Sequence, residues 1–322
     1  MRIPIKALAA TLLIASATAL PAAAQNYPDK SVSFLVPFAA GSATDQLARA
    51  LGQSLSEQTK QAVVVDNRPG ASGFIAAQAA ARAPADGYTV LITTNTTHAA
   101  NEHLYKKLPY DPVKDFQPVT LLGKGGQIMV VNPALPVKTV TDFIELARKE
   151  PGKRTFGSGS SSSRIAGELF QQMADVKLIH VPYKSNPMGV TDLLGGQIDM
   201  MITDAATGLP QVKSGKLRAL GLSSSKRSPL APEVPSIYEA GVKGYEMGYW
   251  FGAYVPAGTP APVVARLNEL LVNAVGSSEA RQFFETTGTE PASSTPEELA
   301  SFQTAEAQKW GRIIKAAGIV AE

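Results

Sequence analysis

The sequence predicts an α/β fold of two α/β units in tandem, with a ligand cleft between them. Short apolar runs such as Val32 to Pro37 alternate with stretches whose apolar residues recur at helical spacing. This alternation starts again at residues 128–131, which indicates a second unit. Without a leader of 24 residues, 298 residues (322 − 24) remain, more than the ~100–200 usual for one domain.

The first 24 residues are typical of a secretory signal peptide. Arg2 and Lys6 give a positive start, Ala7 to Leu20 is apolar, and alanines precede the cleavage point expected near Ala24. A membrane anchor is the alternative, but the apolar run is shorter than the ~20 residues that a spanning helix needs. We therefore expect a periplasmic protein.

Composition excludes several classes of function. The chain has 30 basic and 27 acidic residues, and removal of Arg2 and Lys6 with the leader leaves a net charge of +1 (28 − 27). Such a balance implies no basic patch for nucleic acid. The chain has no cysteine, which excludes cysteine catalysis and thiolate metal sites.

The first unit is predicted to be a parallel sheet with strands at 32–37, 62–66 and 88–93. Leucines 47, 51 and 55 lie on one face of the helix after the first strand. Ser72 is expected to cap an alanine-rich helix that ends near Arg82.

The second unit begins with the strand 128–131 and a helix that Thr141 can cap. Strands at 154–157, 178–181, 198–203 and 217–222 then alternate with helices at 165–173, 188–195 and 206–214. Residues 223–249 are irregular. Trp250 to Val255 is a strand, and two or three helices follow, with Pro262 and Pro296 near helix starts.

We assign residues 25–125 plus 250–322 to a discontinuous domain 1 and residues 126–249 to domain 2. The interface between such units is a favoured place for a small ligand.

The loop 38–45 follows the first strand and opens the first helix. Helix starts offer free N–H groups and partial positive charge to an anion, and Gly41 lets the backbone approach closely. An ordinary strand-to-helix turn, with Asp45 as a first-turn acid, is the alternative. The candidate ligand contacts are Phe38, Ala39, Ala40, Gly41, Ser42 and Asp45.

The loop 157–164 opens a helix of the second unit and is rich in serine. Its hydroxyls can donate to a carboxylate, and a bound anion would explain a cation near a helix start. The alternative is a solvated loop with a surface arginine. The candidates are Ser158, Ser160, Ser161, Ser162, Ser163 and Arg164.

Four further residues complete the candidate site. Thr94 and Asn95 directly follow the third predicted strand, and Asp204 follows the strand 198–203. Asp204 is expected either to orient a ligand hydroxyl or amine or to cap the next helix. Phe251 is included, although a place in the core is the favoured explanation for both Trp250 and Phe251.

Signatures of catalysis are weak. His98 and His103 are five residues apart, about 500° on a helix, so they do not share a face for a metal. No Gly-x-Ser-x-Gly sequence occurs, and we expect no His or Asp partner close to any of the serines. We predict no enzyme activity, no metal and no cofactor.

The sequence resembles the Bug family, the extracytoplasmic receptors of tripartite tricarboxylate transporters. The resemblance covers nearly the whole mature chain. It rests on 27–28, 36–38, Gly41, Asp45, 67–73, 86–88, 108–112, 166–170, 181–184, 194–199, 215–220, 234–236 and 256–260.

This resemblance implies a clamshell of the periplasmic-binding-protein kind, with loops 38–45 and 158–164 holding a ligand carboxylate. It also implies delivery of the ligand to a membrane permease. We expect the protein to be a monomer. The chain departs from the family pattern at Ala40, where a glycine is usual, and at Arg164, where a histidine is usual.

Arg164 can form a direct ion pair that a neutral histidine cannot. We therefore expect a firmly held carboxylate on a dicarboxylate or an aromatic acid. If Arg164 is paired internally instead, a smaller ligand is expected. A sensory subunit that docks to a receptor kinase and an exported serine hydrolase are the competing interpretations.

Overall fold

The computed structural model describes residues 27–224 and 227–321, so the predicted leader and its cleavage point lie outside the described residues. The predicted α/β class is confirmed. The strands are β1 (Val32–Val36), β2 (Val63–Asn67), β3 (Thr89–Thr94), β4 (Phe116–Val131), β5 (Thr155–Ser158), β6 (Ile179–Pro182), β7 (Met200–Asp204), β8 (Arg218–Leu222), β9 (Gly248–Pro256) and β10 (Glu290–Pro291).

The α-helices are α2 (Ala43–Thr59), α3 (Phe74–Ala81), α4 (Asn101–Leu104), α5 (Val140–Lys149), α6 (Ser161–Met173), α7 (Asn186–Leu194), α8 (Ala205–Lys213), α9 (Ala261–Val275), α10 (Ser278–Thr287) and α11 (Pro296–Ala316). A 3₁₀ turn, η2 (Ala71–Gly73), precedes α3, and a π-helical turn, η3 (Thr96–Ala100), precedes α4. Pro262 and Pro296 lie in the first turns of α9 and α11, as predicted.

The strands form a continuous, mixed sheet in the order β2-β1-β3-β9-β4-β7-β5-β6, with β8 and β10 also paired to β4. β1 runs parallel to β2 and β3, as predicted. β9, however, lies antiparallel between β3 and β4. We call the part with β1, β2, β3 and β9 the first half, and the part with β5 to β8 the second half.

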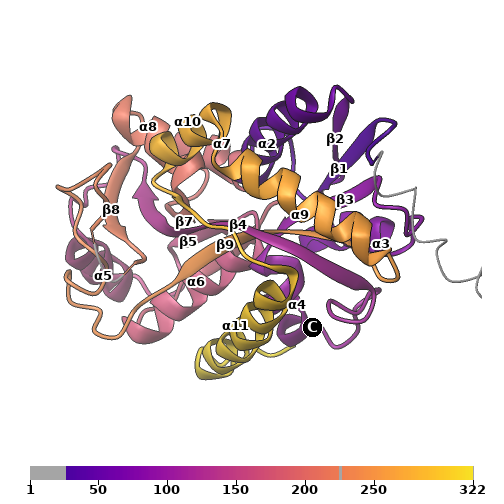
Figure 1. Ribbon diagram of the computed structural model, residues 1–322. Helices are drawn as coiled ribbons and strands as arrows, with labels where there is room; N and C mark the ends of the chain where they lie inside the picture. The colour runs from indigo at the N-terminus through magenta and orange to yellow at the C-terminus, as the bar shows by residue number, and fades with distance from the viewer. Residues whose placement is uncertain (1–26, 225–226, 322) are drawn as a thin grey trace, which may run out of the picture.

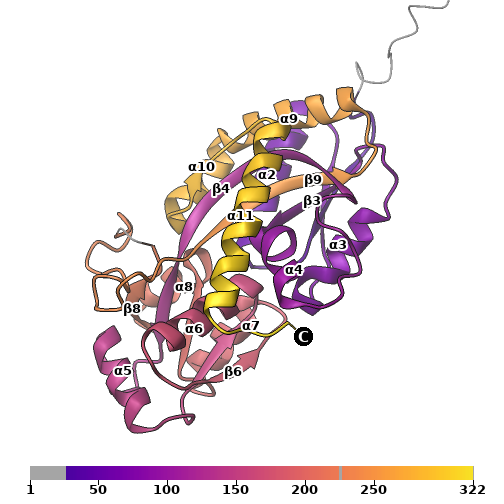
Figure 2. The same cartoon turned by 90° about the horizontal axis from the view of Figure 1, so that it is seen from below.

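β4 crosses from one half to the other (Figure 2). Its residues 116–126 pair with β9, and residues 127–131 pair with β7. The sequence predicted only 128–131 as strand, because Pro118 and the glycines at 123, 125 and 126 interrupt the apolar pattern. The change of partners is next to the predicted domain boundary at 125/126, which stays a prediction.

Apolar helix faces cover the first half on both sides. Leu47, Leu51 and Leu55 of α2 are fully buried in one cluster with apolar residues of α9 and α10. On the other side, the alanines of α3 pack in one cluster with Leu104 of α4 and Trp310 of α11. Figure 1 shows α2, α9 and α10 on one side of the sheet and α11 on the other.

In the second half, the alternation along β4 directs side chains to two separate clusters. Ile128 and Val130 pack with apolar residues of α7 and α8, whereas Met129 and Val131 face α5 and α6. Within residues 27–224 and 227–321, no helix is both long and apolar enough to cross a membrane.

Two predicted helix caps are wrong. Thr139, not Thr141, caps α5: its hydroxyl accepts from the N–H of Asp142 at 3.0 Å, and the Asp142 carboxylate accepts in return. Ser72 has φ of +51° and its hydroxyl lies 2.8 Å from that of Tyr105, so it is not available to cap α3. In both cases a longer-range or reciprocal contact outweighs the local signal.

Candidate functional site

The loop between β1 and α2 is held by its own polar residues. Ser42 is the N-cap, and its hydroxyl accepts from the Asp45 N–H at 3.3 Å. The buried Asp45 carboxylate accepts from the Gly41 N–H at 2.8 Å and pairs with Arg49 at 2.9 Å. The N–H groups of Ala43 and Thr44, the first two residues of α2, make no intrahelical hydrogen bond. They are therefore available to an anion.

The loop between β5 and α6 is built in the same way. Ser160 is the N-cap, and its hydroxyl accepts from the Ser163 N–H at 3.2 Å. The Gly159 N–H donates to Asn186 at 2.9 Å, and a Cβ at Gly159 would lie 1.9 Å from the Ser185 carbonyl carbon. Only glycine therefore allows the approach of this loop to the start of α7.

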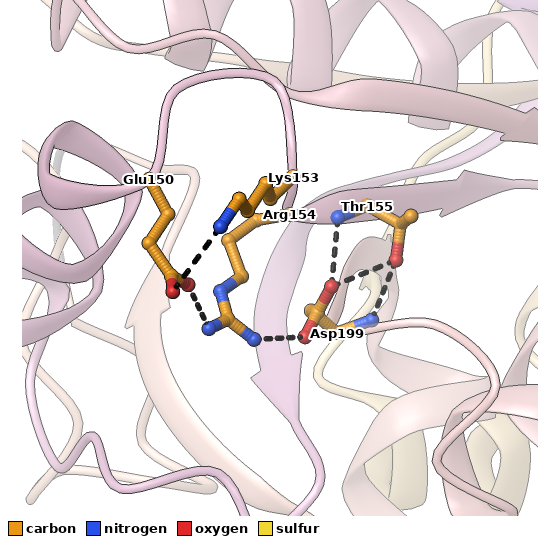
Figure 3. Close-up of polar contacts among 5 residues, drawn as sticks. All are labelled: Glu150, Lys153, Arg154, Thr155 and Asp199. Carbon is orange, nitrogen blue, oxygen red and sulfur yellow. Dashed lines mark hydrogen bonds and ion pairs between the residues drawn. The ribbon is translucent and has the colours of Figure 1, made fainter.

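The other end of β5 is held by the polar network drawn in Figure 3. The Asp199 carboxylate accepts from the N–H and the hydroxyl of Thr155 at 2.8 and 2.9 Å and from Arg154 at 3.2 Å. Arg154 also pairs with Glu150. The network joins the first residue of β5 to the chain just before β7. It therefore fixes the position of the strand that carries the loop between β5 and α6.

A first, small cavity of about 30 Å³ lies where the starts of α2, α6, α7 and α8 meet β4 and β9. Both halves of the sheet contribute to its wall. It is lined by Phe38, Ser42, Ala43, Thr44, Thr94, Gln127, Gly159, Ser160, Ser162, Asn186, Asp204, Tyr249 and Phe251. Helix starts from both halves thus point their partial positive charge into one space.

Asp204 is the one acidic residue in the wall of this cavity among the described residues. It caps α8, since its carboxylate accepts from the Thr207 N–H at 2.9 Å, and it also accepts from Asn186 at 2.7 Å. The predicted cap is therefore confirmed, while the other prediction, that Asp204 orients a ligand hydroxyl or amine, stays a prediction. Burial raises the pKa of the Tyr249 hydroxyl, and the nearby charge of Asp204 raises it further, so Tyr249 stays a neutral phenol.

A second cavity of about 360 Å³ shares Gly159 and Ser160 with the first. Its wall contains Arg164 and Lys184 from the second half and Tyr105 from the first. Ser72, Ser158, Ser161, His180, Pro182 and Tyr183 complete the lining. Burial raises the pKa of Glu168, one turn along α6, while the guanidinium of Arg164 acts in the opposite direction. Arg164 thus lies beside an acid of its own helix.

The predicted residues separate into three groups. The first cavity contains Phe38, Ser42, Thr94, Ser160, Ser162, Asp204 and Phe251. The second contains Ser158, Ser160, Ser161 and Arg164. Neither cavity is lined by Ala39, Ala40, Gly41, Asp45, Asn95 or Ser163. The role of each residue in ligand binding stays a prediction.

Several of these residues have structural partners. Ser161 donates to Asn101 at 2.7 Å and so joins the two halves. Ser163 donates to the Ile202 carbonyl, and Asn95 accepts from the Trp250 N–H at 3.4 Å. Trp250 belongs to the core, as expected, and Phe251 packs in the core while one part of it meets the first cavity.

Sequence reasoning missed the wall that β4, α7 and β9 supply, which includes Gln127, Asn186 and Tyr249. The expectation that no histidine lies near a serine is also wrong. His180 Nε2 is 2.7 Å from Ser158 Oγ, because β5 and β6 are parallel neighbours with Ser158 and His180 close in register. In the described part of the chain, no group of three or more His, Asp or Glu side chains is arranged to hold a metal.

The chain is similar to a family of transporter receptors and to solved binding proteins. Residues 47–319 match the family described as the tripartite tricarboxylate transporter family receptor. R. palustris Rpa4515, solved with adipate, is 36% identical with a TM-score of 0.89, over 92% of this chain and 100% of that one. The periplasmic binding protein BugD is 31% identical with a TM-score of 0.88, over the same shares.

MatC from Rhodopseudomonas palustris, solved with malate, is 29% identical with a TM-score of 0.84, over 89% of this chain and 100% of that one. These neighbours are binding proteins, and their likeness confirms the clamshell of two α/β units. The family match covers most of the chain, and it confirms the resemblance stated from the sequence. The chain therefore belongs to the Bug family of tripartite tricarboxylate transporter receptors.

Proposed function

We propose that this protein is a periplasmic receptor that binds a small carboxylate in the first cavity and catalyses no reaction. The observation that carries the proposal is the convergence of the α2 and α6 starts, one from each half, on a single cavity. Unpaired N–H groups of Ala43 and Thr44, with the Ser160 and Ser162 hydroxyls, would receive the carboxylate oxygens. Because the donors come from both halves, a bound carboxylate would stabilise their contact.

A dicarboxylate or an aromatic acid is the favoured ligand class. The second cavity supports this choice, since it adjoins the first and brings the cations Arg164 and Lys184 to a ligand that extends past Ser160. A dicarboxylate is also supported by two similar proteins, Rpa4515 and MatC, which were solved with adipate and with malate. Arg164 would hold the far carboxylate through two parallel hydrogen bonds.

The first experiment is a melting-temperature screen of purified residues 25–322 against C4 to C6 dicarboxylates, tricarboxylates, acidic amino acids, nicotinate, benzoates and phthalates. A ligand at 100 times its Kd should add ~2.7 kcal/mol, or several degrees at roughly 2–4 °C per kcal/mol. No shift with any carboxylate would contradict the proposal.

The matched variants are Arg164→Ala and Arg312→Ala. Arg312 is exposed on α11 and lines neither cavity. Arg164→Ala should weaken the best ligand at least tenfold, whereas Arg312→Ala should leave its Kd unchanged. A loss of less than twofold at Arg164 would refute the direct ion pair and leave the carboxylate site itself standing.

Delivery to permease subunits of a tripartite tricarboxylate transporter is the proposed role of the loaded receptor. Export should remove the leader near Ala24, which N-terminal sequencing of the periplasmic protein would test. Crosslinking in membranes would separate a permease partner from a receptor kinase, the partner expected for a sensory subunit.

One contact favours a second candidate function, an exported serine hydrolase. Ser158 Oγ and His180 Nε2 lie at 2.7 Å, within reach for proton transfer from a nucleophile to a base. Turnover of small ester or amide substrates that is lost in Ser158→Ala would establish that activity. Turnover that survives the substitution would come from a contaminant.

A further inference from the structure

The buried side chain of Asn186, at the start of α7, joins two parts of the second half. Its Nδ2 donates to Asp204 Oδ2 at 2.7 Å, and its Oδ1 accepts from the Gly159 N–H at 2.9 Å. Asp204 is the cap of α8, and Gly159 lies in the loop between β5 and α6. Asn186 therefore connects the start of α8 with a loop that lines both cavities.

The carboxylate of Asp204 has its partners within the second half. Oδ1 accepts from the N–H and the hydroxyl of Thr207 at 2.9 and 2.7 Å. Oδ2 accepts from Asn186 and, at 3.5 Å, from the Thr203 hydroxyl. An ionised carboxylate has about four acceptor sites, and these four donors occupy them. This occupancy favours a role of Asp204 as an anchor for Asn186 over a direct contact with a ligand.

The groups at its two ends determine which way the Asn186 amide faces. A carboxylate can only accept hydrogen bonds, and a backbone N–H can only donate. The NH₂ group must therefore face Asp204, and the carbonyl oxygen must face Gly159. A turned amide would oppose two acceptors at one end and two donors at the other, and buried groups would be left unpaired. Asp204 thus orients Asn186, and Asn186 holds the Gly159 N–H.

The position of Gly159 determines where the next hydroxyls lie. Gly159 directly precedes Ser160, whose hydroxyl caps α6 and lies 3.1 Å from that of Ser162. Ser160 and Ser162 both line the first cavity. A loop held at Gly159 therefore presents these two hydroxyls in a fixed arrangement, which a ligand does not have to impose when it binds.

We propose that Asp204 and Asn186 are positioning residues of the carboxylate site. Asp204 orients the Asn186 amide, and this amide holds the Gly159 loop so that the Ser160 and Ser162 hydroxyls meet the carboxylate. The inference rests on the proposed function and deepens it, because it separates the residues that hold the loop from those that contact the ligand.

A purely electrostatic role of Asp204 predicts the opposite result for one variant. If Asp204 acted on a bound anion only through its charge, Asp204→Asn would strengthen binding, since like charges repel. The positioning role predicts weaker binding. An asparagine at 204 keeps one oxygen, so it can accept from Thr207 or from Asn186 but not from both. Calorimetry would measure the Kd of adipate and of benzoate, one probe for each favoured class of acid.

The double variant that combines Asn186→Asp with Asp204→Asn provides the sharpest test. Asn186→Asp alone places two carboxylates against each other. In the double variant, the new carboxylate accepts from Gly159 and from the new amide, whose oxygen still accepts from Thr207. Each single variant should weaken both probes about tenfold, ~1.4 kcal/mol. The double variant should bind within threefold of the native protein, which independent effects would not produce.

Asn132→Ala is the matched control for a loss of stability without a loss of positioning. Asn132 also lies in the second half, where it accepts from the Ala134 N–H at 2.9 Å and donates to the Leu193 and Leu194 carbonyls at 3.0 and 3.1 Å. It lines neither cavity. This variant should melt at a lower temperature and leave the Kd of both probes unchanged.

Hydrogen exchange of the Gly159 amide tests the position of the loop without any ligand. Exchange should be at least tenfold faster in each single variant and close to the native rate in the double variant. Native exchange or native Kd in the single variants, or a double variant no better than they are, would overturn the inference and leave the carboxylate receptor standing. If neither probe binds the native protein, the favoured ligand classes of the proposed function fail, and exchange at Gly159 alone decides the inference. Should one single variant not fold, judged by its melting curve, the other single variant and the double variant still decide.

Discussion

His98 should make this protein lose stability in mild acid. Its ring is completely buried in η3, stacks on Tyr254 with centroids 3.9 Å apart, and lies edge-on to Phe116. Nδ1 is 2.8 Å from the Thr97 hydroxyl, and Nε2 has no partner in the described part of the chain. Burial lowers the pKa of His98 to about 3.

The lowered pKa of His98 determines whether folding stability rises or falls with pH. An unfolded histidine has a pKa of ~6.5, so between pH 6.5 and 3 the unfolded chain takes up a proton that the folded protein refuses. The free energy of unfolding therefore has its full value above pH 6.5 and decreases as the pH drops below it. From RT ln(1 + 10^(6.5 − pH)), the loss is about 2 kcal/mol at pH 5 and about 3 kcal/mol at pH 4.

Urea unfolding at pH 8 and pH 5 would measure this loss in the native protein and in His98→Phe. The variant is expected to be weaker at both pH values, but its loss between them should be about 2 kcal/mol smaller. Tyr254→Phe is the control, because it removes a buried hydroxyl that has no partner in the described residues and keeps His98. Equal pH dependence in the native protein and His98→Phe would refute the reasoning.

Three further predictions concern the stability of single variants. Thr139→Ala should lower the free energy of unfolding, measured in urea, by about 1 kcal/mol, because it removes the α5 cap. Thr141 is exposed on the same helix, so Thr141→Ala should change it by less than ~0.5 kcal/mol. A larger loss in Thr141→Ala than in Thr139→Ala would contradict the cap. Asp199→Ala should lower the free energy of unfolding by about 2 kcal/mol, since it leaves the Thr155 N–H without its acceptor. An unchanged urea midpoint would show that the network in Figure 3 contributes no stability. Gly87→Ala should lower the melting temperature by several degrees, because φ is +83° and a Cβ would lie 2.3 Å from Val263; an unchanged melt would mean that the backbone there relaxes freely.

The features that could be predicted are those with a local signal. The leucines at 47, 51 and 55 mark one face of a helix whatever it packs against, and that face is buried as expected. Strand β1 is apolar except for Ser33, as is typical of a strand that is covered on both sides. The two loops at the ends of β1 and β5 were found because a strand followed by a helix places a helix start there.

What could not be predicted depends on partners far along the chain. Residues 116–126 carry glycines and a proline, and they form a strand because β9, more than a hundred residues later, pairs with them. The position of Arg164 in the second cavity depends on which elements meet its helix face, which spacing does not give. The contact of Ser158 with His180 needed the register of β5 and β6.

The place of β9 between β3 and β4 also determines the order in which the protein can fold. The end of β4, β5 to β8 and the residues up to Met247 that pack on them are close together in the sequence, so the second half can assemble before β9 is made. The first half begins the chain but cannot close its sheet until residue 256 is available, and until then β3 and β4 present unpaired edges. Open strand edges recruit other chains. A fragment that ends before β9 should therefore aggregate, and the part synthesised first should be the last to reach its native structure.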